Sequence, residues 1–166
     1  MVFRNWKDSK VVKPETLKTP KDTHIYTMVY NFLDHTADVK FIAEAETIEN
    51  AFIDSAKALQ EAICGKITIL EQETKTFEVQ GTNLESLLYK FLEEFLVLLD
   101  SEDFLLSEIK ELELDQETFK IKATIAGDKG DHYKFTNDVK AVTYSEMFVK
   151  FNEEKNVWQT QVVLDV

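Results

Sequence analysis

Two aspartates four residues apart interrupt an otherwise apolar stretch of the chain. The segment NFLDHTADVKF, residues 31–41, has a polar centre that contains Asp34, His35 and Asp38. Asp34 is followed by two polar residues, an order typical of a turn or cap whose carboxylate accepts backbone N–H groups. Asp38 instead stands directly before Val39, at the start of an expected strand. A carboxylate there needs donors or a cation, because an unpaired buried charge is very costly.

The last residues of the sequence, QVVLDV, offer a second group of carboxylates. In an extended strand, Asp165 points to the face opposite Leu164 and Val166. Asp165 and the terminal carboxylate of Val166 are then neighbours, and both are negative at neutral pH. If this strand lies beside Asp38, three anionic groups meet and repel one another unless a cation joins them or one is protonated. Oxygen ligands suit a hard divalent ion, Ca²⁺ or Mg²⁺, and not zinc.

Composition and charge exclude several classes of protein. The chain has 166 residues, of which 44% are hydrophobic and 30% are charged, as in one globular domain. No apolar run reaches the roughly 20 residues of a membrane span, and we expect no signal peptide and no membrane association. The net charge is −12, and because residues 1–23 hold six basic and three acidic side chains (+3), the remainder carries −15. This strongly acidic remainder of the chain disfavours direct nucleic-acid binding and suits a basic protein partner or a cation.

Motifs of enzymatic chemistry are missing from the sequence. There is no glycine-rich phosphate loop, zinc-ligand spacing, nucleophile elbow or EF-hand loop, so we expect no catalytic residues and no enzyme. His24, His35 and His132 lie far apart, and an isolated histidine is usually structural. Cys64, the single cysteine, fits a reducing compartment, and we expect a cytoplasmic protein, or a nuclear one in a eukaryote.

The elements that must position these residues follow from hydrophobic periodicity. Residues 1–23 contain both prolines and no sustained period, so they are expected to form a flexible polar extension before a domain of residues 24–166. One helix is predicted from a Thr47 cap to Gly65, and a second from a cap at Thr82 or Asn83. The expected strands cover residues 24–33, 39–45, 67–73, 74–80, 107–115, 118–126, 139–144, 147–152 and 157–166. This pattern predicts an α+β domain whose two helices cover one face of a largely antiparallel sheet.

Four segments together resemble the archease family. They are DHTADV at 34–39, LESLLYKFLEEFL at 84–96, VKAVTY at 139–144 and VVLDV at 162–166. They occur in the family's order and at similar spacing, and the resemblance extends from about Tyr30 to Val166. It implies a cofactor of RtcB-type RNA ligases, not an enzyme. Those ligases use GTP and a divalent metal in tRNA splicing to join a cyclic or 3′-phosphate end to a 5′-hydroxyl end, and the archease promotes guanylylation of the ligase histidine and repeated turnover.

The same resemblance assigns roles to particular residues. It maps a cation site to Asp38, Asp165 and Val166, for which we expect Ca²⁺, with Mg²⁺ and Mn²⁺ as alternatives. The free protein is expected to be a monomer that binds the ligase and not RNA directly. The residues expected to contact the ligase are Asp34, His35, Lys140 and Tyr144.

Two positions depart from the family pattern, and two other functions stay open. Many members have glycine at the position of Lys40 and histidine at that of Ser145, although animal-type archeases share the serine. One alternative function is a stand-alone metal-dependent phosphoester hydrolase, since carboxylates can hold a metal that activates water. The other is a general chaperone or adaptor that uses the phenylalanine-rich helix of residues 84–99.

Overall fold

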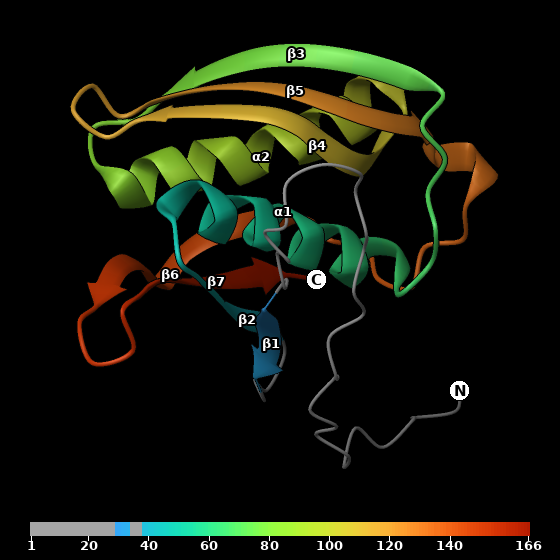
Figure 1. Cartoon of the computed structure of the whole chain (residues 1–166). Coiled ribbons are helices and arrows are strands. Elements are labelled where there is room, and N and C mark those ends of the chain that lie inside the picture. Colours follow the sequence, from blue (N-terminus) through green and yellow to red (C-terminus); the bar gives the residue numbers. More distant parts are fainter. Residues whose placement is uncertain (1–28, 34–37) are drawn as a thin grey trace, which may run out of the picture.

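Two helices lie between two antiparallel sheets in the computed structural model, which describes residues 29–33 and 38–166 (Figure 1). Helix α1 contacts β2 and β7 of one sheet and β4 of the other, and α2 contacts β6 of the first sheet and β4 of the second. The strand orders are β1-β2-β7-β6 and β3-β5-β4. The elements are β1 (Tyr30–Leu33), β2 (Val39–Ala45), α1 (Ile48–Cys64), β3 (Glu73–Gln80), α2 (Leu84–Glu102), β4 (Phe104–Asp115), β5 (Lys120–Lys129), a 3₁₀ turn (Gly130–His132), β6 (Ala141–Asn152) and β7 (Val157–Asp165).

The α+β class with two helices and antiparallel strands is confirmed, and the strands divide into two sheets. One expected strand, residues 67–73, is wrong: strand structure begins only at Glu73. Part of the backbone before it bonds to side chains: Ser107 Oγ donates to the Ile69 carbonyl at 2.7 Å, and Leu70 N–H donates to Tyr133 Oη at 3.0 Å. The Gln72 N–H, next to the start of β3, already donates to the Gly127 carbonyl of β5 at 2.8 Å. The expected extension and the expected domain start at residue 24 lie outside the described residues.

Both helices begin at a capping residue, and α1 also ends at one. Thr47 Oγ1 accepts the Asn50 N–H at the start of α1, and Gly65, at φ 73°, ends that helix. At the start of α2, Asn83 forms a reciprocal capping box with Ser86, so Asn83 is the cap and not Thr82. These caps satisfy N–H groups that a helix leaves without intrahelical partners.

The hydrophobic core lies between the two sheets, where the two helices pack. Four rings form a phenylalanine cluster at its centre, namely Phe52, Phe77, Phe91 and Phe95. Phe91 and Phe95 of α2 are buried, so this helix does not expose the phenylalanine-rich face that a general chaperone or adaptor would need. No helix among the described residues is long and apolar enough to cross a membrane.

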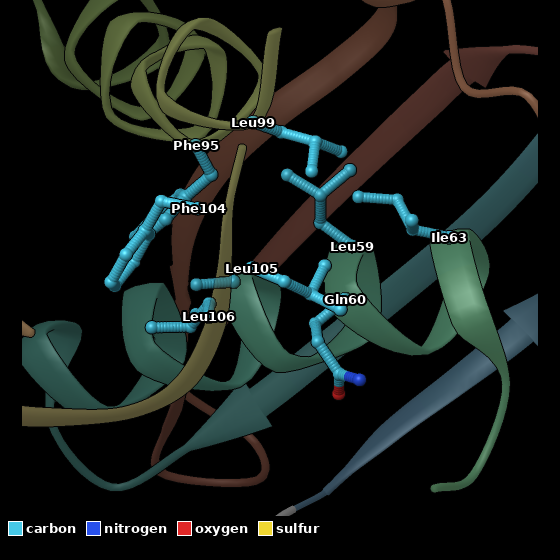
Figure 2. Close-up of a pocket in the computed structure, with 9 residues that line it drawn as sticks. Leu59, Gln60, Ile63, Phe95, Leu99, Phe104, Leu105 and Leu106 are labelled. Carbon is cyan, nitrogen blue, oxygen red and sulfur yellow. The ribbon is translucent and has the colours of Figure 1, made fainter. Parts of the chain in front are cut away.

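One small cavity lies inside this core between α1, α2 and β4. Figure 2 shows its lining, in which Gln60 is the polar member among apolar side chains such as Leu59, Phe95 and Leu105. Its volume is about 10 Å³. That volume is about the minimum for one water molecule, so the cavity is a packing gap and not a ligand site.

A nearly buried carboxylate anchors the loop that follows β5. Asp128 is 3% exposed and accepts hydrogen bonds from Tyr133 Oη at 2.7 Å and from Lys129 N–H at 2.8 Å. The Tyr133 hydroxyl, with these other donors, lowers the pKa of Asp128 below its ordinary 3.8. His132 Nδ1 lies 3.2 Å from the same carboxylate, and this contact, with Asp131 and Asp103 nearby, raises the pKa of His132 above 6.5.

The contributions of Asp128 and His132 to the free energy of unfolding should change with pH in opposite directions. Because the folded pKa of His132 is raised, its contribution is fully present below pH 6.5 and is lost as pH rises through the folded value. The Asp128 contribution is present above pH 3.8 and is lost as pH falls through its lowered folded pKa. We expect His132→Gln to lower the urea midpoint more at about pH 5.5 than at about pH 8.5, by a small amount since the histidine is exposed. Equal losses at the two pH values would contradict the ion pair.

Candidate functional site

Strands β2 and β7 bring Asp38 and Asp165 to the same end of the four-stranded sheet. In the antiparallel register Val39 lies opposite Leu164, and Asp38 and Asp165 are the residues that follow outward on the two strands. Continued by one residue, this register places Asp38 opposite Asp165, and directly opposed residues point to the same face. Asp38 is half-buried and Asp165 is exposed. The two aspartates singled out in the sequence are therefore neighbours across two strands.

Strand β6 completes this end of the sheet on the other side of β7. Ala141 lies opposite Asp165, and the Lys140 N–H donates to the Asp165 carbonyl at 2.8 Å. That bond fixes the backbone of Asp165, and the half-buried Val166 follows directly. Asp165 is thus held against β6, and Val166 is the residue after it.

The residues expected to contact a partner fall into two groups. Lys140 and Tyr144 are both exposed and belong to the β6 side of the site, whereas Asp34 and His35 lie outside the described residues. The Tyr144 ring stacks on Tyr89 of α2, with ring centres 4.3 Å apart and planes within 8°. An exposed aromatic ring held in one orientation by a second ring is a suitable contact for another protein.

A feature that the sequence did not predict lies on the face of the sheet away from the helices. Lys40 of β2 forms an ion pair with Glu146 of β6, across the intervening strand β7. Val163, which lies opposite Lys40, is 1% exposed although it does not belong to the core under the helices. The two partners are 106 residues apart in the sequence, and no sequence signal links them.

An acidic hollow lies beside this end of the sheet. It is lined by Asp100 and Asp103 at the end of α2 and by Asp138 and Val139 just before β6, and its volume is about 260 Å³. Within residues 29–33 and 38–166, no three His, Cys, Asp or Glu side chains are grouped to hold a metal ion. The hollow therefore borders the start of β6, two residues before the Lys140 N–H that donates to the Asp165 carbonyl, and it forms no metal site of its own.

Residues 30–166 match the Archease protein family. The chain belongs to the archease family. It is 35% identical over 136 residues to the protein archease of Pyrococcus abyssi, covering 80% of this chain and 95% of that protein. It is 33% identical over 132 residues to the protein archease of the fish Ictalurus punctatus, covering 78% and 82%.

A solved structure supports the fold independently. The solution structure of protein 1598 of Methanobacterium thermoautotrophicum superposes with a TM-score of 0.71 at 26% identity, and the match covers 82% of this chain and 98% of that one. The matched region begins at Tyr30, where the motif resemblance also begins. Archease family membership supports, at the level of the family, a role as a cofactor associated with a tRNA ligase.

Proposed function

We propose that this archease family member activates an RtcB-type RNA ligase in tRNA splicing. It promotes the GTP-dependent guanylylation of the ligase histidine and repeated turnover, and it catalyses no step itself. The observation that carries the proposal is the pairing of β2 with β7, which sets Asp38 beside Asp165 at an exposed, acidic end of the sheet in a protein of this family. A ligase site that handles GTP and RNA phosphates is rich in basic groups and metal, so it complements this acidic end.

The donor set at this end suits a hard divalent cation. Asp38 and Asp165 would offer carboxylate oxygens, and Val166 would offer a main-chain oxygen beside them as a third donor. Ca²⁺ is the expected ion, with Mg²⁺ and Mn²⁺ as alternatives, because such ions prefer oxygen ligands. A bound divalent ion would offset the charge of the two aspartates and would offer a coordination position to a phosphate oxygen. So few protein donors leave positions for water or for a ligand from the ligase.

The residues of the chain itself act by positioning and attraction. The Lys140 N–H holds the Asp165 backbone at 2.8 Å, so the Asp165 side chain projects from a fixed point at the rim of the sheet. The net charge of −12 and the aspartates of the neighbouring hollow attract a basic surface. Docking stabilises the ligase conformation competent for histidine attack on GTP if the archease binds that conformation more tightly than the others.

The test is a guanylylation assay with purified ligase, GTP and this protein. We expect Asp38→Asn and Asp165→Asn each to reduce the stimulation by about tenfold or more, as loss of a metal ligand or docking carboxylate would. Glu113→Gln is the matched control, because this exposed carboxylate lies on β4 in the other sheet. Full stimulation by both folded aspartate variants would refute the role of the site. Phosphoester turnover by the isolated protein would instead favour the hydrolase alternative.

A further inference from the structure

The ion pair between Lys40 and Glu146 bridges three strands of the same sheet that carries the candidate site. Lys40 comes from β2 and Glu146 from β6, and β7 runs between them. The Lys40 side chain is only 15% exposed, whereas Glu146 is 49% exposed. Lys40 is therefore laid along the sheet over Val163, with its ammonium drawn toward β6.

Glu146 reaches Lys40 because β6 bulges at this point. The register with β7 breaks between Thr143 and Phe148, so residues 144–147 are not paired in the ladder. Glu146 adopts φ 53°, a conformation uncommon for a residue other than glycine. Its carbonyl oxygen accepts a hydrogen bond from Gln161 Nε2 at 2.7 Å. The bulge is thus fastened to β7, and its position is fixed by contacts other than the ion pair.

Lys40 is also close enough to the candidate site to interfere with it. Asp38 and Lys40 are two residues apart and so project from one face, with Cα atoms roughly 7 Å apart. Lys40 lies opposite Val163, which is two residues before Asp165. A lysine side chain with four flexible methylene groups can span such a distance. Turned the other way, its ammonium would pair with one of the carboxylates that are proposed to receive a divalent ion.

We propose that Glu146 is a positioning residue that holds the Lys40 ammonium away from Asp38 and Asp165, and so prevents it from competing with a divalent cation for those carboxylates. This inference rests on the proposed function, since it assumes that the aspartates bind a cation. On this reading the β6 bulge places Glu146 where it can pair with Lys40. That pairing lets a lysine stand two residues from Asp38 without binding the aspartates. The lysine and its counter-ion form one unit, because without the glutamate the lysine becomes an internal competitor.

The test is a double-mutant cycle measured by calorimetric titration of the metal-free full chain with Ca²⁺. The variants are Glu146→Gln, Lys40→Met and the two combined. We expect Glu146→Gln alone to weaken Ca²⁺ binding by about tenfold, a typical coupling between sites. In the Lys40→Met background the same substitution should change affinity little, because no competing ammonium remains. Lys40→Met alone should bind Ca²⁺ at least as tightly as the natural sequence.

Several outcomes overturn the inference. If Glu146→Gln weakens binding equally in both backgrounds, its carboxylate acts only through the general field of the protein. Glu153→Gln, which removes one negative charge from the β6–β7 turn, measures that field effect separately. If Glu146→Gln changes nothing while Asp165→Asn abolishes binding, Glu146 has no positioning role but the proposed cation site stands. If the folded natural sequence binds no Ca²⁺, Mg²⁺ or Mn²⁺, the cation part of the proposed function fails as well.

Discussion

Replacing Phe91 with alanine is expected to lower the free energy of unfolding by about 3–5 kcal/mol, the range for deleting a large buried aromatic side chain. Phe91 is 0% exposed at the centre of the layer between the two sheets. Its ring lies 5.1 Å from that of Phe95, 5.9 Å from Phe52 and 6.0 Å from Phe77, measured between ring centres. The substitution removes all three contacts and leaves a cavity that tightly packed neighbours fill only in part.

Urea unfolding followed by circular dichroism measures this loss. The matched control is Val97→Ala on the same helix, because Val97 is 48% exposed and should change the free energy of unfolding by no more than about 0.5 kcal/mol. A loss at Phe91 no larger than that at Val97 would mean that the phenylalanine cluster does not hold the two sheets together.

Local patterns in the sequence predicted the helices well. The apolar stripe of each helix and the caps at Thr47 and Asn83 depend on residues within one or two turns, so they can be read from a short window. The expected strand over residues 67–73 failed because the hydroxyls of Ser107 and Tyr133, distant in sequence, bond to the backbone of Ile69 and Leu70 in place of a neighbouring strand.

The division into two sheets could not be predicted from the strands themselves. Alternation tells which side chains share a face, but it does not tell which strand lies next to which. Strand β2 pairs with β7 at the far end of the chain and not with β3, the strand that follows it in sequence. Nor did the sequence show that the two segments of β6 are one strand with a bulge.

The candidate site shows the same limit at the level of single residues. Sequence reasoning found Asp38 and Asp165 because a carboxylate beside a buried strand needs a partner, but only the β2–β7 register makes them neighbours. The sequence also shows that Lys40 departs from the family pattern, but it does not show that Glu146 is the counter-ion of Lys40. Glu146 could not be found, since it reaches Lys40 through a bulge that has no glycine to signal it.

Adding Ca²⁺ is expected to reverse the order of stability of the Asp165→Asn variant and the natural sequence. Without divalent ions, Asp165→Asn should be at least as stable as the natural sequence, because it relieves the repulsion of neighbouring negative groups. With free Ca²⁺ at about 100 times its dissociation constant, the natural sequence should gain about 2.7 kcal/mol, the amount that binding to the folded state alone supplies. The variant should gain much less and become the less stable form.

Thermal unfolding in chelator and in Ca²⁺ measures this reversal, and it separates specific binding from general screening. Screening by a divalent salt weakens repulsion across the whole acidic surface, so it would raise the midpoints of both forms in parallel. Glu113→Gln, whose carboxylate lies on the other sheet, should follow the natural sequence at every Ca²⁺ concentration. Parallel midpoints for Asp165→Asn and the natural sequence would mean that the meeting of β2 and β7 creates no cation site, and that any docking to a ligase depends on surface charge alone.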